Sequence, residues 1–128
     1  MMKIDHFAIW TDDLERLRDF YMTYFSATSG EKYFNPVKQF ESYFLSFGDG
    51  PRLEIMRAPG IIAHENKGKS SGLTHFAISV GSKLNVDALT EHLRSDGYHV
   101  AGEPRTTGDG YYESVVIDPD GNSIEITI

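Results

Sequence analysis

One short segment occurs twice in this sequence and limits the folds available to it. His6-Phe7-Ala8-Ile9 in the first half returns as His75-Phe76-Ala77-Ile78 in the second. The closing segments of the two halves also match, as Arg-Leu-Glu-Ile at 52–55 and Ser-Ile-Glu-Ile at 123–126. Matching segments at a long, nearly constant interval indicate two copies of one module rather than one α+β sandwich.

The first half has the pattern strand, helix, strands. Alternating polarity over 4–10 predicts a strand with His6 and Trp10 on one face. Asp12 and Glu15 have the spacing of a capping box, and an apolar stripe behind them predicts a helix that ends just before Gly30. The other expected elements are a loop at 31–39 and strands at 40–47 and 52–56.

The second half repeats this order. It predicts a strand at 73–80, a helix that ends at Gly97 and a short strand at 98–101. A loop at 103–110 and strands at 112–117 and 123–128 follow. The predicted fold class is therefore α+β, with two tandem βαβββ modules forming a curled mixed sheet around a cavity. We expect one domain, 1–128, made of modules 1–58 and 72–128 joined by a linker at 59–71.

Each module opens with a strand that carries a histidine and closes with a strand that carries a glutamate. The flanking residues, mostly apolar, are expected to pack under the helices; they are Asp5, Phe7, Leu53, Ile55, Thr74, Phe76, Ile124 and Ile126. His6, Glu54, His75 and Glu125 then face the concave side of the sheet. Two imidazoles and two carboxylates form a plausible divalent-metal site that keeps water positions for substrate.

A simpler interpretation is that these residues are structural. A strand histidine is more often a core residue than a ligand, and a glutamate near a chain end is usually solvated. An uncompensated buried carboxylate costs several kcal/mol, so two glutamates facing a cavity require a cation or a basic partner. Arg52 shares a face with Glu54 and is the competing partner, whereas four residues at repeat-related positions favour the metal.

Composition excludes several other classes. The chain has no cysteine, which excludes disulfides, thiolate zinc sites and a cysteine nucleophile. A net charge of −7 with both signs interspersed argues against nucleic acid or an anionic membrane as partner. No apolar run approaches a membrane span, and the first residues lack a signal-peptide pattern. We expect a cytoplasmic protein that acts on a small molecule.

The sequence resembles the vicinal oxygen chelate superfamily, also called the glyoxalase/bleomycin resistance/dioxygenase superfamily. The resemblance is carried by His6, Glu54, the segment 72–77 and the segment 118–125, Asp-Pro-Asp-Gly-Asn-Ser-Ile-Glu. It implies paired βαβββ modules around a metal centre, generally in a homodimer whose subunits in many members complete each other's sites. Glyoxalase I resembles the order His, Glu, His, Glu found here, whereas extradiol dioxygenases and fosfomycin resistance enzymes resemble His, His, Glu.

By this resemblance, a divalent metal (nickel, zinc, cobalt, manganese or iron) would hold the two oxygens of a hemithioacetal. Glu125 or Glu54 would move a proton between adjacent carbons through an enediolate, giving a 2-hydroxyacyl thioester. Two positions depart from glutathione-using glyoxalases, which have arginine at Trp10 and asparagine at Ala58. We therefore expect a glyoxalase I-like lyase or isomerase that does not strictly use glutathione, with Trp10, Arg52 and Tyr111 contacting substrate.

Other functions of the same scaffold stay open. One is a ring-cleaving dioxygenase or an antibiotic-modifying thiol transferase. Another is a metal-free protein that sequesters a small molecule, as bleomycin resistance proteins do, in a cleft lined by aromatic side chains. Trp10, Phe44, Tyr111 and Tyr112 could supply that cleft. The sequence leaves open the substrate, the metal, and whether the modules pair within one chain or across a dimer.

Overall fold

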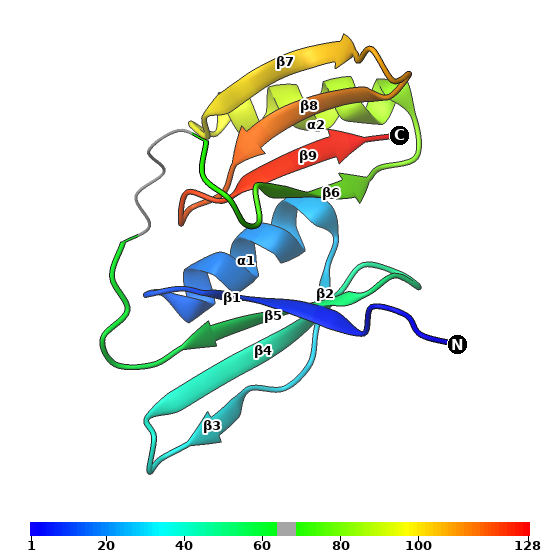
Figure 1. The fold of residues 1–128 in the computed structure, drawn as a ribbon. Helices are drawn as coiled ribbons and strands as arrows, with labels where there is room; N and C mark the ends of the chain where they lie inside the picture. Colours follow the sequence, from blue (N-terminus) through cyan, green and yellow to red (C-terminus); the bar gives the residue numbers. More distant parts are fainter. Residues whose placement is uncertain (64–68) are drawn as a thin grey trace. The chain divides into compact units, whose positions relative to one another are not determined.

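A computed structural model describes residues 1–63 and 69–128 of the chain (Figure 1). It contains two compact units whose boundary lies between Ala63 and His64, and each is described by itself. The predicted linker at 59–71 includes residues 64–68, which lie outside the described residues. Within the described ranges, no helix has the length and apolar character that crossing a membrane requires.

The first unit is one helix on a mixed sheet. Its elements are β1 (His6–Trp10), α1 (Leu14–Phe25), β2 (Thr28–Ser29), β3 (Tyr33–Asn35), β4 (Phe40–Ser46) and β5 (Arg52–Arg57). The strand order is β1-β5-β4-β2, and β3 also pairs with β4. β1 runs parallel to β5, and the other pairs are antiparallel. The unit therefore has the predicted strand–helix–strands order, with two additional short strands, β2 and β3.

Helix α1 begins one residue later than the capping pattern predicts. Asp13 is the N-cap, and its side chain accepts a hydrogen bond from the Arg16 N–H at 3.1 Å. The predicted box of Asp12 with Glu15 is wrong, because the Glu15 carboxylate is taken by Lys32 and Tyr43 instead. The helix ends at Phe25, with Ser26 in the left-handed region at φ 55°. It therefore ends well before Gly30.

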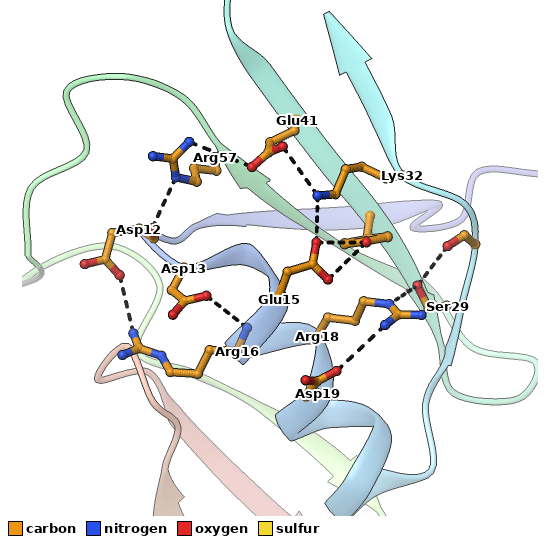
Figure 2. Close-up of polar contacts among 12 residues, drawn as sticks. Asp12, Asp13, Glu15, Arg16, Arg18, Asp19, Ser29, Lys32, Glu41 and Arg57 are labelled. Carbon is orange, nitrogen blue, oxygen red and sulfur yellow. Dashed lines mark hydrogen bonds and ion pairs between the residues drawn. The ribbon is translucent and has the colours of Figure 1, made fainter.

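A polar network joins α1 to the sheet (Figure 2). Lys32 Nζ lies 2.6 Å from Glu15 Oε1, and the Tyr43 hydroxyl donates to the same oxygen at 3.0 Å. The hydrogen bond from Lys32 lowers the pKa of Glu15 and raises the pKa of Lys32, while burial raises the pKa of Tyr43. The Arg18 guanidinium covers the Tyr43 ring at 4.8 Å. Tyr43 on β4 therefore faces α1.

This contact identifies the two faces of the first sheet. Residues directly opposite in an antiparallel pair point to the same face, and Tyr43 pairs with Ile55 while Leu45 pairs with Leu53. Leu45, Leu53 and Ile55 are completely buried. They form a core with the apolar stripe of α1: Leu14, Leu17, Phe20, Tyr21 and Phe25. Glu54, between Leu53 and Ile55, must point to the face opposite the helix.

The second unit has the same plan. Its elements are β6 (His75–Ser79), α2 (Lys83–Ser95), β7 (Val100–Thr106), β8 (Tyr112–Ile117) and β9 (Ser123–Thr127). The strand order is β6-β9-β8-β7, with β6 parallel to β9. The first sheet has the same strand order if β2 and β3, which both pair with β4, are taken together as the counterpart of β7. The predicted α+β class with a repeated strand–helix–strands module is confirmed.

Two predicted loops are partly strand. Tyr33–Asn35 forms β3 within the expected loop at 31–39, and β7 extends to Thr106 through the expected loop that starts at Glu103. β7 lies at the sheet edge and contains Pro104, a residue that edge strands tolerate because it lacks an N–H. Its pairing with β8 shifts register on both sides of Gly102. Proline and irregular register hide such a strand from periodicity.

A buried hydroxyl pair identifies the helix face of the second sheet. Thr90 on α2 donates to the Val86 carbonyl at 2.6 Å, and its hydroxyl lies 2.7 Å from the Ser114 hydroxyl on β8. Ser114 pairs with Ile126, and Val116, two residues further on and on the same face of β8, pairs with Ile124. Both isoleucines therefore face α2. Both are completely buried. Glu125 between them points to the opposite face.

Candidate functional site

In the first unit, a histidine and a glutamate meet on the sheet face opposite α1. Ala8 pairs with Glu54 across β1 and β5, and His6 shares the face of Ala8. His6 Nε2 lies 3.8 Å from Glu54 Oε1. The His6 side chain is 39% exposed and that of Glu54 is 17% exposed. His6 and Glu54 therefore share a face of the sheet, as predicted, and their potential metal-binding atoms point toward each other.

The second unit contains the corresponding pair. Ala77 pairs with Glu125 across β6 and β9, and His75 shares that face. His75 Nε2 lies 3.1 Å from Glu125 Oε2, and both side chains are partly exposed. As predicted, the flanking Ile124 and Ile126 are buried in the core. Each unit thus presents one imidazole beside one carboxylate.

Two residues predicted to pack under the helices do not: Thr74 is exposed just before β6, and Asp5 also departs from the predicted alternation. Strand β1 begins at His6, so Asp5 lies before it and its carboxylate is not directed under the helix. Asp5 Oδ2 accepts from His6 Nδ1 at 2.8 Å and from Arg52 Nη2 at 2.9 Å. The hydrogen bond with His6, together with Arg52, holds the pKa of Asp5 below its ordinary value. Arg52, which was expected to compete with a metal for Glu54, is instead hydrogen-bonded to Asp5.

Glu113 is a further carboxylate that the sequence analysis did not single out. Glu113 pairs with Thr127 and Val115 with Glu125, which places Glu113 on the face of Glu125. Burial, followed by its hydrogen bond with Glu125, raises the pKa of Glu113. The predicted strand at 112–117 placed Glu113 on one of its two faces, but only the burial of Ser114 in the structure shows that this is the face opposite the helix. Two carboxyl groups therefore lie side by side on the face that carries His75.

The donor atoms of both pairs suit a divalent cation. Nitrogen and oxygen ligands bind zinc and similar ions at about 2.1 Å, so two ligands on one ion lie roughly 3 to 3.4 Å apart. The separation of 3.1 Å in the second unit falls in this range, and 3.8 Å in the first is slightly wider. Within 1–63 and 69–128, no group of three or more potential ligands is brought together. Each pair alone is thus half of a typical site.

Aromatic side chains accompany His6 on its face of the first unit. Trp10 is 50% exposed and packs edge-on against Phe40, with ring centroids 6.3 Å apart. Phe40 also contacts Tyr33, which is 56% exposed, at 6.1 Å. Tyr33 was missed because it lies in the segment predicted to be a loop. The exposed rings form an apolar surface beside the His6 strand.

The other proposed contact residues are placed differently. The Arg52 guanidinium covers the Phe44 ring at 4.3 Å, close to His6. Tyr111 is 57% exposed in the turn before β8, and its N–H donates to the Thr107 hydroxyl. The Tyr112 hydroxyl donates to Asp87 on α2 at 2.5 Å. Tyr112 therefore lies on the helix face, away from Glu125, and does not fit the predicted aromatic cleft.

Comparison with known structures supports the fold. The trypanothione-dependent glyoxalase I of Leishmania major superimposes with a TM-score of 0.80 at 24% identity, over 99% of this chain and 86% of that one. Glyoxalase I of Zea mays gives 0.80 at 26% identity, over 98% of this chain and 44% of that one. A glyoxalase family protein from Enterococcus faecalis gives 0.79 at 24% identity, over 98% and 97%. The predicted glyoxalase-like fold is confirmed.

Sequence comparison agrees. The uncharacterized protein YqjT of Bacillus subtilis is 41% identical over 58 residues, which is 43% of this chain and 45% of that protein. The matched region thus spans less than half of this curated relative, as the chain does of the maize enzyme. The family model of the Glyoxalase/Bleomycin resistance protein/Dioxygenase superfamily matches residues 3–126. The chain therefore belongs to the Glyoxalase/Bleomycin resistance protein/Dioxygenase superfamily.

Proposed function

We propose that this protein is a metal-dependent, glyoxalase-like lyase or isomerase that acts on a small molecule with vicinal oxygens. His6, Glu54, His75 and Glu125 are the proposed ligands of one divalent cation. The observation that carries the proposal is the His–Glu pair on each unit, with donor atoms 3.8 Å and 3.1 Å apart. Repetition of this pair in both modules is difficult to explain by packing, because all four side chains lie opposite the helices.

The chemistry follows from the donor set. A bound divalent cation supplies Lewis acidity toward two neighbouring substrate oxygens. Glu125 is the proposed general base, since its carboxylate is partly exposed and the face it occupies is the one a substrate would reach. It removes a proton from one substrate carbon and returns it to the adjacent carbon, with Glu54 the alternative carrier.

The aromatic surface supports a substrate unlike glutathione conjugates. Trp10, exposed and backed by Phe40, stands where glutathione-using members have arginine. An indole face binds planar or apolar groups and cannot pair with a carboxylate. We expect the hemithioacetal of methylglyoxal and glutathione to turn over far below the usual enzymatic kcat of about 1 to 10³ per second. Turnover within that range would refute this part of the proposal.

The same surface also favours a second candidate, metal-free sequestration of an aromatic ligand. Trp10 and Tyr33 are half exposed and could stack on such a molecule. Sequestration requires no cation. Metal content therefore separates the two candidates.

Metal binding is tested on protein purified without chelators. Elemental analysis is expected to find about one divalent ion per chain, and His75→Ala to lose it. His92→Ala is the matched control, because His92 is an exposed helix residue that pairs with Asp96. Wild-type protein with no more metal than the His75→Ala variant would remove the basis of the enzyme proposal.

We also infer a homodimer, and mixing variants tests how its sites are built. If His6 of one chain and His75 of another serve the same ion, mixed dimers of His6→Ala and His75→Ala contain one intact site. Mixing two inactive variants is then expected to restore metal binding and activity to a fraction of the sites. No restoration after subunit exchange would indicate that each chain builds its own site.

A further inference from the structure

The two histidines are held differently, although their strands are equivalent. Asp5 precedes His6 and bonds to its ring at 2.8 Å, whereas the exposed Thr74 precedes His75. Arg52 pairs with His6 across the sheet, and Ser123 occupies the corresponding place opposite His75. At these two positions the first unit has charged side chains next to its histidine, and the second unit has hydroxyl side chains.

The Asp5 contact determines which nitrogen of His6 carries the proton. An ionised carboxylate can only accept hydrogen bonds, so the short contact requires a proton on His6 Nδ1. A neutral imidazole then has its lone pair on Nε2, and Nε2 is the atom directed toward Glu54. The tautomer favoured by Asp5 is therefore the one that can bind a cation beside Glu54.

Arg52 and Phe44 hold this arrangement in place. Arg52 Nη2 donates to the same Asp5 oxygen at 2.9 Å, and its guanidinium lies 4.3 Å above the Phe44 ring. The His6 ring packs edge-on against Phe44, with centroids 5.3 Å apart. Arg52 thus keeps the Asp5 carboxylate against the His6 imidazole, and Arg52 is itself held by its contact with Phe44 on β4.

We propose that Asp5 is a positioning residue, which with Arg52 fixes the Nδ1–H tautomer and ring orientation of His6 and makes the first unit the preorganised half of the metal site. This inference rests on the proposed function. Groups that orient a metal-binding histidine typically contribute about 10- to 100-fold to metal affinity. Asp5 touches neither cation nor substrate in this role.

The test compares Asp5→Leu, Asp5→Asn and Asp49→Leu with the wild type. Leucine removes the acceptor, whereas the asparagine oxygen can still accept from Nδ1. Asp49→Leu is the matched control, since Asp49 is exposed in the turn between β4 and β5. Nitrogen NMR of the imidazoles in metal-free protein, at about pH 9 where imidazoles are neutral, reads the tautomer. Titration with Zn²⁺ against a competing chelator gives the affinity.

We expect His6 to be the Nδ1–H form in wild type, Asp5→Asn and Asp49→Leu, and to shift toward the Nε2–H form in Asp5→Leu. Zn²⁺ affinity is expected to fall about 10- to 100-fold in Asp5→Leu only. An unchanged tautomer in Asp5→Leu, or unchanged affinity when wild type binds Zn²⁺, overturns the inference. If wild type binds no Zn²⁺, the proposed function fails, and the tautomer shift alone decides the role of Asp5.

Discussion

Replacing Ile55 with alanine tests the orientation on which the first His–Glu pair depends. Ile55 follows Glu54 on β5 and is completely buried on the helix face, so Glu54 must point the other way. The substitution removes three buried carbons, worth about 2.4 kcal/mol at about 0.8 kcal/mol each. The cavity left between sheet and helix adds to this, and we expect the free energy of unfolding to fall by about 3 to 4 kcal/mol.

Urea denaturation measures this loss. With a slope of about 1 to 3 kcal/mol per molar, the midpoint should fall by at least about 1 M. Ile62→Ala is the matched control, because Ile62 is 86% exposed, and its effect should stay within about 0.5 kcal/mol. If Ile55→Ala were as stable as Ile62→Ala, Ile55 would lie outside the core. The assignment of Glu54 to the opposite face would then be wrong.

Three further experiments test polar contacts. Thr90→Val leaves the buried Ser114 hydroxyl without its partner and should lower the free energy of unfolding by about 1 to 3 kcal/mol. Adding Ser114→Ala should recover part of that loss in a double-mutant cycle, and additive losses would refute the contact. Glu113→Gln should stabilise the metal-free protein at pH 7, because burial and Glu125 raise the pKa of Glu113 and so make its ionised form unfavourable in the folded state. In urea titrations the gain should vanish below about pH 4.5, and destabilisation at pH 7 would contradict this reasoning. Glu15→Gln should lower the free energy of unfolding by at most about 1 kcal/mol at pH 7, because Lys32 stabilises the ionised form of Glu15 and lowers its pKa. The melting temperatures of the wild type and the variant should converge as the pH falls below about 4.5, and a constant difference would argue against the ion pair.

The orientation of the proposed ligands could be predicted from sequence because strand periodicity is strict. Side chains alternate between faces, and the apolar neighbours Leu53, Ile55, Ile124 and Ile126 identify the buried face. The repeat then relates one module to the other without knowledge of strand pairing. These two signals were sufficient to assign each histidine and glutamate to the face opposite the helix, whereas the pairing of β1 with β5 and of β6 with β9 is what brings each histidine beside the glutamate of its own unit.

Features outside regular strands could not be predicted in this way. Asp5 lies just before β1, where alternation does not apply, and its carboxylate turns toward His6 and Arg52. Glu15 has the spacing of a capping box, but it bonds to Lys32 and Tyr43, which are distant in sequence. Such contacts depend on which strands pair and on where the helix lies. Local patterns do not contain that information.

X-ray absorption spectroscopy of protein loaded with one equivalent of Zn²⁺ tests the central claim most directly, because it counts the imidazoles bound to the ion. The proposed ligand set predicts two imidazoles with the remaining donors oxygen in the wild type, and loss of this imidazole signal in both His6→Ala and His75→Ala, which no longer hold the ion. A wild-type spectrum without imidazole scattering, or one that neither substitution changes, would contradict the assignment of both histidines to a metal site.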